Sequence, residues 1–296
     1  MRCQIVQFDS NLARAGLFVR PEHEILRCRS SRKAASLLDR FQKLSSTRFS
    51  LTSSEDFFRS SASYYTDYRK PLPNQLFSLI REKFKLTGDG SLVDIGCGTG
   101  QLALPLRGDF RTIVGVDLSE VMIESAWQRA TELKASNAEF LVMPGEEIDS
   151  LPESFDLVTF GSSIHWMDIS KTLTASYKLL KDDGGVAIIG MRSIWGGSDE
   201  WEQAVVRVVQ KWMGTERRAG SSTFQISTKT DVTFEESLEL AGFSVFSSGV
   251  VDASYSVDIP FIIGHLYTTS YCNRDLLGEN VNAFEGELTD ELLRLD

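Results

Sequence analysis

The sequence predicts an α/β protein whose core is a Rossmann-like, doubly wound and mostly parallel sheet. From about residue 72 onward, short apolar runs alternate with amphipathic segments of helical period. Alternating strand and helix patterns are typical of parallel sheets covered by helices on both faces. A glycine-rich turn after the first run and an acidic residue at the end of the second indicate a ligand-binding edge.

The expected elements begin with a helix in LPNQLFSLIREKF, whose apolar residues recur at spacings of three and four. Five apolar runs follow, and their lengths fit strands that are buried on both faces. In chain order they are SLVDIG, TIVGVDLS, EFLVMP, FDLVTFG and GGVAIIG. Helices are expected between them in EVMIESAWQRATELKA and DISKTLTASYKLLKD, and the second helix should end at Gly184 and Gly185.

The pattern changes after the fifth strand. A helix is expected at 199–213, and the capping box of Thr233 and Glu236 opens another that stops at Gly242. An extended strand in FSVFSSGVVDASYSV and a short helix in PFIIGHLYTTSY come next. We expect helices from 195 to 240 and from 258 to 285 to form a cap. The predicted domains are a basic arm (1–50), a helical lid (51–88), a Rossmann-like core (89–192) and cap helices with a C-terminal strand region (193–296).

Composition limits the classes of function. The net charge of -10 disfavours a polyphosphate, so we expect no nucleic acid partner. The four cysteines form no CxxC pair and the three histidines are dispersed, so neither a disulfide framework nor a metal site is indicated. No apolar run is long enough for a membrane span and no signal-peptide pattern is present. We therefore expect a soluble, cytoplasmic protein without a membrane partner, and the oligomeric state stays open.

The first fifty residues are basic, with ten Arg and Lys against four Asp and Glu. An organelle transit peptide, a helical arm and a disordered leader are all compatible with this composition. Because Glu22, Glu24 and Asp39 interrupt the acid-poor pattern of a transit peptide, we favour a solvated arm or short helix. His23 lies in this arm and is expected to be exposed.

The segment VDIGCGTG (93–100) follows the first strand and opens the next helix. Glycine in such a turn lets the backbone approach a ligand closely. The spacing of Gly96, Gly98 and Gly100 is G-x-G-x-G, which departs from the dinucleotide pattern G-x-G-x-x-G. Asp117 ends the second strand, where a carboxylate can accept both ribose hydroxyls. Together these features predict a nucleoside ligand other than a dinucleotide.

With these residues the chain resembles the class I S-adenosylmethionine-dependent methyltransferases. The resemblance covers about residues 60–285 and rests on VDIGCGTG, GVDLSEVMIESA, PGEE, FDLVTFGSSIHWMD and LLKDDGGVAIIG. Within the family, the chain is similar to the small-molecule branch that includes the trans-aconitate methyltransferases, whose fourth strand commonly leads into a His-Trp pair. The resemblance implies the class I methyltransferase fold, S-adenosylmethionine as cofactor, S-adenosylhomocysteine as product and no metal. It also implies a small organic acceptor, in small-molecule metabolism or natural product biosynthesis.

The resemblance further implies a cofactor site. Asp94 and the glycine turn would face the methionine moiety and ribose, and Asp117 would hold the ribose hydroxyls. Arg69 would pair with the methionine carboxylate, Leu118 would lie against adenine, and the stretch from Gly145 would meet the adenine amine. The complete implied set is Arg69, Asp94, Gly96, Cys97, Gly98, Gly100, Asp117, Leu118, Gly145, Glu146 and Ser162.

The acceptor side is implied by two further segments. SASYYTDYRKPLPNQLF is similar to the family's YxxYRPxYP lid, although Leu72 stands where Tyr is usual, and GHLYTTSY is similar to its closing cap. The expected acceptor-binding residues are Tyr65, Tyr68, Trp166, His265 and Tyr267. The alternative interpretation is that these side chains only cap the core.

His165 follows the fourth strand at the edge where ligands of open α/β sheets bind. Methyl transfer needs mainly alignment, and needs a general base only when the acceptor must lose a proton. His165 is the expected catalytic residue for that step, and Trp166 offers its ring to the sulfonium. In the alternative interpretation His165 bonds a loop backbone and Trp166 fills the core.

Two questions stay open at this stage. The family's sheet usually finishes with an antiparallel seventh strand, but here an acidic helix at 283–295 leads directly to Asp296. We expect the seventh strand to be missing through truncation, or the sheet to be completed differently. The same cofactor also serves 3-amino-3-carboxypropyl transfer, its own cyclisation and assisted rearrangements, and a non-enzymatic nucleoside-binding module is a third possibility.

Overall fold

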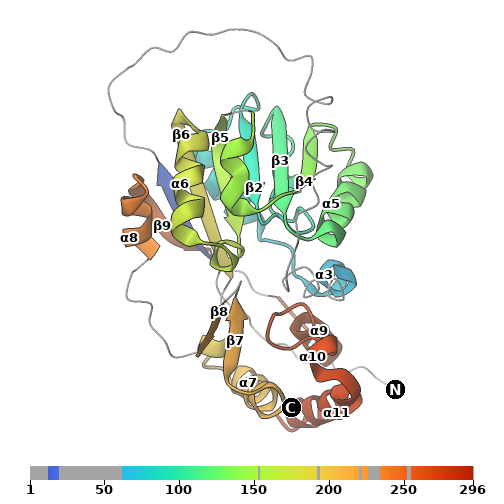
Figure 1. Cartoon of the computed structure of the whole chain (residues 1–296). Helices are drawn as coiled ribbons and strands as arrows, with labels where there is room; N and C mark the ends of the chain where they lie inside the picture. Colours follow the sequence, from blue (N-terminus) through green and yellow to red (C-terminus); the bar gives the residue numbers. More distant parts are fainter. Residues whose placement is uncertain are drawn as a thin grey trace.

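The computed structural model describes residues 13–19, 62–152, 154–191, 194–219, 222–225, 234–251 and 255–295. A seven-stranded sheet with the order β4-β3-β2-β5-β6-β1-β9 forms its centre. Figure 1 shows this sheet between helices, with a second group of helices below the ends of its strands. The predicted Rossmann-like, doubly wound and mostly parallel sheet is confirmed, and its five parallel strands with flanking helices match the class I methyltransferase fold.

The five parallel strands coincide with the five apolar runs of the sequence. They are β2 (Ser91–Ile95), β3 (Thr112–Asp117), β4 (Ala138–Val142), β5 (Phe155–Gly161) and β6 (Leu180–Met191). The strand order reverses direction at β2, which pairs with β3 on one side and β5 on the other. Ligands of open α/β sheets bind at the carboxyl ends of the strands beside such a point.

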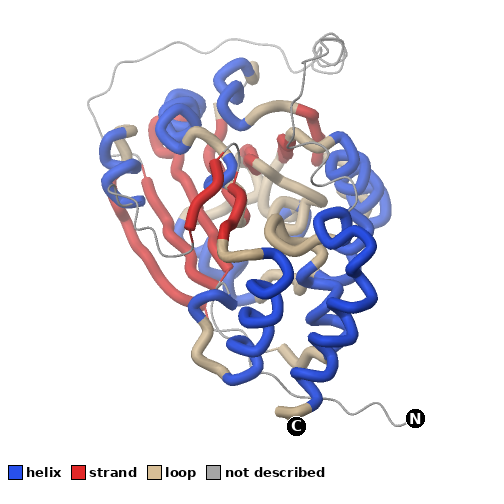
Figure 2. The backbone as a smooth tube through the Cα atoms, turned by 60° about the horizontal axis from the view of Figure 1, so that its bottom comes forward, coloured by secondary structure: helices blue, strands red, loops and turns tan. Residues whose placement is uncertain are grey.

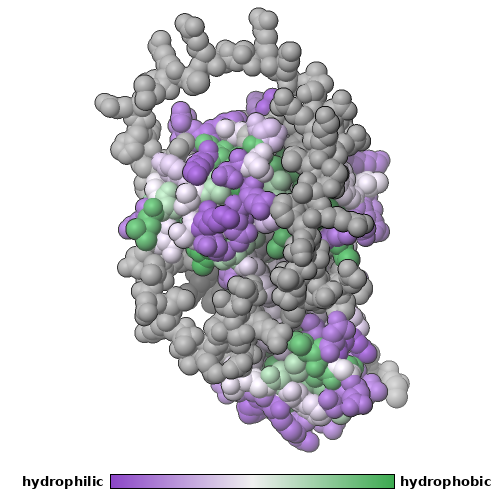
Figure 3. Space-filling model, in the orientation of Figure 1, coloured by the Kyte–Doolittle hydropathy of each residue, from purple (hydrophilic) through white to green (hydrophobic). Residues whose placement is uncertain are grey.

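Helices cover both faces of the sheet, and each face has its own apolar core. The helices of one face are α4 (Asn74–Lys83) and α5 (Glu120–Glu132), and those of the other are α6 (Ile169–Leu179) and α8 (Phe234–Leu240). Neighbouring residues of β2 alternate between the two cores, with Leu92 in the first and Val93 in the second. Hydrophilic residues gather over α6 on the molecular surface (Figure 3).

The end of α6 differs from the prediction. The helix ends at Leu179 and β6 begins at Leu180, so the pair Gly184 and Gly185 lies inside a strand. A Cβ atom at Gly184 would lie 3.0 Å from the carbonyl oxygen of Phe155 in the neighbouring β5. Glycine is therefore required there for close strand approach rather than for ending a helix.

The seventh strand comes from the N-terminal part of the chain. Strand β1 (Ala13–Val19) lies between β6 and β9 (Ser244–Val251) and is antiparallel to both. The expectation of a solvated arm or short helix is therefore wrong for this segment, while the rest of 1–50, including His23, lies outside the described residues. The basic composition of the arm as a whole concealed the short apolar run that pairs with the sheet.

The remaining helices build a cap with its own core. It contains α7 (Glu200–Met213), the hairpin of β7 (Glu216–Ala219) and β8 (Ser222–Gln225), α9 (Ile259–Leu266), α10 (Arg274–Leu277) and α11 (Val281–Leu293). Val205, Leu266 and Phe284 lie in its core, and Figure 2 shows these helices in front of the sheet. The hairpin was not predicted. Helix α8 does not join the cap as expected, because Leu238 packs under α6 in the core of the sheet.

Two further findings concern the described residues as a set. None of their helices is long and apolar enough to cross a membrane. The described part of the predicted lid consists of α3 (Ala62–Tyr68), the segment after it and α4. Thr233 of the predicted capping box lies outside the described residues, whereas Asp199 and Glu202 form a capping box at the start of α7.

Candidate functional site

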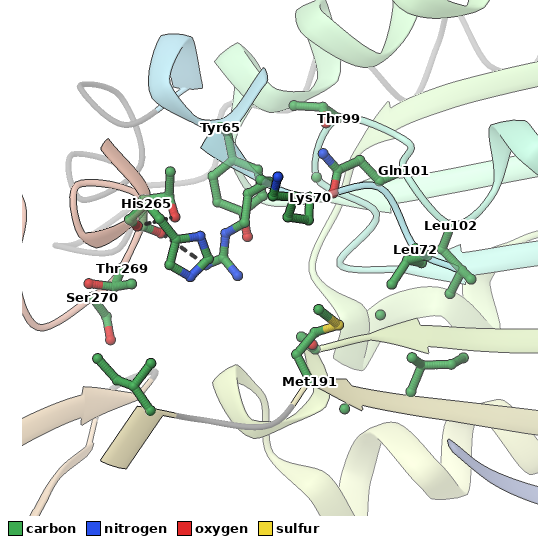
Figure 4. Close-up of a pocket in the computed structure, with 18 of the residues that line it drawn as sticks. Tyr65, Lys70, Leu72, Thr99, Gln101, Leu102, Met191, His265, Thr269 and Ser270 are labelled. Carbon is green, nitrogen blue, oxygen red and sulfur yellow. Dashed lines mark hydrogen bonds between the residues drawn. The ribbon is translucent and has the colours of Figure 1, made fainter. Parts of the chain in front are cut away.

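A cavity of about 460 Å³ lies at the carboxyl ends of β2, β5 and β6, under the lid and the cap. In Figure 4, His265, Thr269 and Ser270 of the cap lie across the open space from Thr99, Gln101 and Met191 of the core. A volume of this size falls in the range of small-molecule and cofactor sites. The cavity is therefore the candidate active site.

The structure brings part of the predicted site to this cavity. Predicted residues that line it are Tyr65, Arg69, Asp94, Gly96, Cys97, Gly98, Ser162, His165, Trp166 and His265. Predicted residues outside its lining are Tyr68, Gly100, Asp117, Leu118, Gly145, Glu146 and Tyr267. The first set joins the glycine turn, the end of β5, the lid and the cap, which lie far apart in the sequence.

Asp94 lies on the floor of the cavity and is almost fully buried. Its Oδ1 accepts a hydrogen bond of 2.8 Å from the Thr159 hydroxyl, whereas its Oδ2 is buried and has no partner among the described residues. Burial, opposed by the Thr159 bond and reinforced by the nearby Asp117, raises the pKa of Asp94 to about 7. A cationic ligand group at Oδ2 would satisfy this carboxylate.

The glycine turn leaves room for a ligand at one position. The backbone of Gly98 has a φ of +52° and a Cβ atom there would meet nothing within 4 Å. At Gly96, by contrast, a Cβ atom would lie 2.4 Å from that of Ser163. Gly96 is thus required by protein packing, and Gly98 keeps the backbone open to the cavity.

Asp117 holds the glycine turn from behind. Its carboxylate accepts hydrogen bonds of 2.9 Å from the backbone N–H groups of Gly98 and Ser119. Burial raises its pKa, and these backbone bonds oppose that shift. A carboxylate can accept about four hydrogen bonds in all, so this arrangement still has acceptor capacity for ribose hydroxyls.

Two of the residues predicted around adenine, Gly145 and Glu146, have contacts within the protein. A Cβ atom at Gly145 would lie 2.6 Å from the sulfur of Met167, so this glycine permits close packing. Glu146 accepts a hydrogen bond of 2.9 Å from the backbone N–H of Asp168, which precedes α6. Leu118 is half-buried at the end of β3.

Four consecutive lid residues, Tyr68 to Pro71, each bond to the cap. The bonds are His265 Nδ1 to Tyr68 O (3.0 Å), Arg69 Nη2 to Thr268 O (3.2 Å), Lys70 Nζ to Ser256 O (3.2 Å) and Tyr255 Oη to Pro71 O (2.7 Å). We call this set the lid–cap clasp. It ties segments nearly 200 residues apart into one wall of the cavity.

His265 is locked in one tautomer by the clasp. The carbonyl of Tyr68 can only accept, so Nδ1 carries the proton and Nε2 remains an acceptor. Burial and then the neighbouring Arg69 guanidinium lower the pKa of His265 to about 4. The imidazole is therefore neutral at physiological pH and can orient a donor group of a ligand.

Of the other predicted aromatic residues of lid and cap, Tyr68 and Tyr267 pack within the protein and Tyr65 lines the cavity. The ring of Tyr68 lies against Gly264, where a Cβ atom would meet it at 2.3 Å. Tyr267 donates a hydrogen bond of 2.7 Å to Glu285 of α11, and its pKa is raised by burial and by this carboxylate. Tyr65 lines the cavity, with the guanidinium carbon of Arg69 4.7 Å from its ring centre.

His165 and Trp166 lie in the short 3-10 helix Ile164–Trp166 that follows β5. Their ring centres are 5.6 Å apart, both residues line the cavity, and His165 is exposed. Ser162 before them adopts a φ of +56° and donates its backbone N–H to Ile189 O. This turn directs the segment across the cavity mouth.

Three residues at the site were not found from the sequence. Thr159 was hidden in an apolar strand run, where a lone hydroxyl could have signalled a partner. Lys70 lines the cavity with its ammonium 4.3 Å from the ring centre of Phe261. Arg129 of α5 donates to the carbonyl of Thr99 in the glycine turn at 2.8 Å, and no sequence spacing indicates that contact. Among the described residues, no group of three or more His, Cys, Asp or Glu side chains could hold a metal ion.

Comparison with known proteins points to one kind of domain. Residues 93–188 match the family described as Methyltransferase domain. A probable S-adenosylmethionine-dependent methyltransferase of Saccharomyces cerevisiae is 33% identical over 124 residues, which are 40% of this chain and 43% of that protein. The ubiquinone/menaquinone biosynthesis C-methyltransferase UbiE of Geotalea daltonii is 32% identical over 36% of this chain and 48% of its own length. The chain thus spans about half the length of these curated relatives.

Among solved structures, phosphoethanolamine N-methyltransferase 2 of Haemonchus contortus in complex with S-adenosyl-L-methionine is 26% identical. The similarity covers 47% of this chain and 36% of that chain, with a TM-score of 0.40. The matched residues 93–188 include Asp94, the glycine turn, Asp117 and the His165 segment.

Proposed function

We propose that this protein is an S-adenosylmethionine-dependent methyltransferase that acts on a small organic acceptor. The observation that carries the proposal is the buried Oδ2 of Asp94, which has no hydrogen-bond partner in the part of the chain that the structure describes, together with the open backbone of Gly98. This pair lies at the point where the strand order reverses, within the segment that matches methyltransferase domains. The ammonium group of the cofactor's methionine moiety is a cation that would suit Oδ2.

The proposed cofactor contacts follow from the geometry around this point. Asp94 would receive the ammonium group, Asp117 would hold the ribose through its remaining acceptor capacity, and Arg69 would pair with the methionine carboxylate. Arg69 has a buried Nε without a partner among the described residues, which supports an anionic ligand group nearby. When bound, S-adenosylmethionine supplies a methyl group on a sulfonium that an acceptor displaces in line.

The chain's own residues would then align the acceptor and, where required, take its proton. His265 is neutral and offers only its Nε2 acceptor, so it is suited to orienting a hydroxyl or N–H group. His165 is exposed at the cavity mouth and is the proposed proton acceptor. Trp166 beside it would face the acceptor, as the resemblance to the trans-aconitate branch implies. A cytoplasmic location and a role in small-molecule metabolism are part of the same proposal.

Titration calorimetry with S-adenosylmethionine and S-adenosylhomocysteine tests the cofactor. We expect binding of both, and Asp117→Ala should weaken both because it removes the ribose acceptors and the support of the turn. Absence of binding to either ligand would reject the cofactor assignment.

Product analysis then separates methyl transfer from the other reactions of this cofactor. Methyl transfer yields S-adenosylhomocysteine, whereas carboxypropyl transfer and cofactor cyclisation yield methylthioadenosine. Methylthioadenosine as the main enzymatic product would therefore reject the proposed reaction while keeping the cofactor.

A further inference from the structure

Of the two residues that lie beside Asp94 on the neighbouring strands, only one has a side chain that can hydrogen-bond to it. In the register of the parallel strands, Asp94 lies beside Gly115 of β3 and beside Thr159 of β5. Gly115 has no side chain, and a Cβ atom there would lie 2.4 Å from the ring of Phe140. Side-chain support for Asp94 across the sheet therefore comes from Thr159.

Thr159 fixes the orientation of the carboxylate. Its hydroxyl donates to Oδ1 at 2.8 Å, and both side chains are buried at 1% exposure or less. Because Thr159 holds the carboxylate at Oδ1, the other oxygen has a defined place, and this Oδ2 has no partner within the described ranges. A hydrogen bond to an ionised group in a buried site is stronger than one between neutral groups.

We propose that Thr159 is a positioning residue of the cofactor site, holding Asp94 ionised and oriented so that Oδ2 receives the cofactor's ammonium group. The inference rests on the proposed function and deepens it. It adds a residue of the fourth parallel strand that contacts no ligand itself, since Thr159 is absent from the cavity lining. Its effect passes entirely through Asp94.

Other groups near Asp94 also change its pKa. Asp117 raises the pKa of Asp94, and the nearby backbone N–H of Ala103 lowers it. The Cys97 thiol in the same turn stays neutral, because burial raises its own pKa well above the usual value. Burial has the largest effect on the pKa of Asp94 and disfavours the ionised form. Among the groups that favour the ionised form, Thr159 has the largest effect. Loss of its hydroxyl should therefore move the Asp94 titration to higher pH.

The test compares the binding of three ligands to the full-length protein by calorimetry between about pH 6 and pH 8. S-adenosylmethionine and S-adenosylhomocysteine carry the ammonium group, whereas 5′-methylthioadenosine shares the nucleoside and lacks it. In the wild type, affinity for the first two should rise with pH and level off above about pH 7, where Asp94 is ionised. Affinity for 5′-methylthioadenosine should depend less on pH.

Thr159→Val keeps the shape of the side chain and removes the donor. We expect it to weaken S-adenosylmethionine and S-adenosylhomocysteine binding at pH 7 by about tenfold to a hundredfold. The midpoint of the pH dependence should move upward by about one unit, 5′-methylthioadenosine binding should stay unchanged, and Thr159→Ser should restore the wild-type values. Thr159→Ala removes the same donor and leaves a smaller side chain. It replaces Thr159→Val in the test if the valine variant does not fold.

Thr172→Val is the matched control, because Thr172 of α6 is equally buried and its hydroxyl has no partner among the described residues. It should change neither affinity nor the midpoint. No binding to the wild type would overturn the proposed function itself. Wild-type binding together with an unchanged midpoint in Thr159→Val, or an equal loss of 5′-methylthioadenosine binding, would overturn the role of Thr159 alone.

Discussion

Asp94 is a buried acid, and one of its carboxylate oxygens has no hydrogen-bond partner among the residues that the structure describes. Because its pKa is raised to about 7 from the ordinary 3.8, the folded protein keeps a proton that the unfolded chain releases between these values. The free energy of unfolding of the ligand-free protein should therefore fall as pH rises through this window. Such a cost is typical of sites that are completed by a ligand.

We predict that Asp94→Asn removes most of this pH dependence and most of the S-adenosylmethionine affinity together. Chemical denaturation at about pH 5 and pH 8 should show a smaller difference in unfolding free energy than in the wild type, because the titrating group is gone. Asp183→Asn is the control, since Asp183 is exposed. An unchanged difference in Asp94→Asn would show that other groups carry the dependence.

The two histidines of the cavity should behave differently under mutation. His165→Gln should lower turnover by about a hundredfold when the acceptor must lose a proton, without changing cofactor affinity. His265→Gln should leave the shape of the pH–rate profile unchanged above about pH 5, because His265 with a pKa of about 4 does not titrate there. Steady-state kinetics of both variants across pH measures these effects. Wild-type turnover in His165→Gln would show that His165 is not the proton acceptor.

At the scale of elements, the core strands and helices were predicted well because their period is local. Each parallel strand is an apolar run of the sequence, and α4, α5 and α7 follow the three-and-four spacing. The β7–β8 hairpin was not predicted. The end of α6 was placed too late, because Gly184 allows close packing against β5 and does not end the helix. The lid–cap clasp could not be predicted from the sequence for a different reason. Its side-chain donors bond to backbone carbonyls, and every residue type has such a carbonyl.

We predict that the clasp controls how firmly the cavity is closed. Tyr255→Phe and Lys70→Met each remove one hydrogen bond, worth about 0.5–1.5 kcal/mol. Hydrogen exchange should become several-fold faster in 62–73 and 255–268 in the double variant, and cofactor release should accelerate. Helix α5 provides the internal control, because it makes no clasp contact. Unchanged exchange in both segments would contradict a closing role.

The whole molecule depends on a strand from the other end of the chain. Every residue of β1 has a partner in β6 and another in β9, so this strand closes what would otherwise be two unpaired edges. The cap, by contrast, has its own apolar core between α7, α9 and α11. The stability of the sheet should therefore depend on residues 13–19.

We predict that Gly16→Pro destabilises the protein by about 2–4 kcal/mol more than Gly16→Ala, which keeps the backbone donor. Gly16 lies opposite Ile188 on one side and Ser248 on the other, and proline removes the backbone donor within this ladder. Urea unfolding measures the difference. Equal stability of the two variants would show that β1 does not hold the sheet together.

The sequence by itself determined the parallel core and the place of the glycine turn, because strand period and turn chemistry are local properties. It also marked His165 as a candidate by its position after a strand, whereas Asp94 was expected from the resemblance to the methyltransferases. Only the tertiary structure decided that Thr159 supports Asp94, that Arg69 and His265 meet over the cavity, and that β1 completes the sheet. Those contacts join residues 65 or more positions apart, and their partners are chosen by strand order and packing rather than by any spacing along the chain.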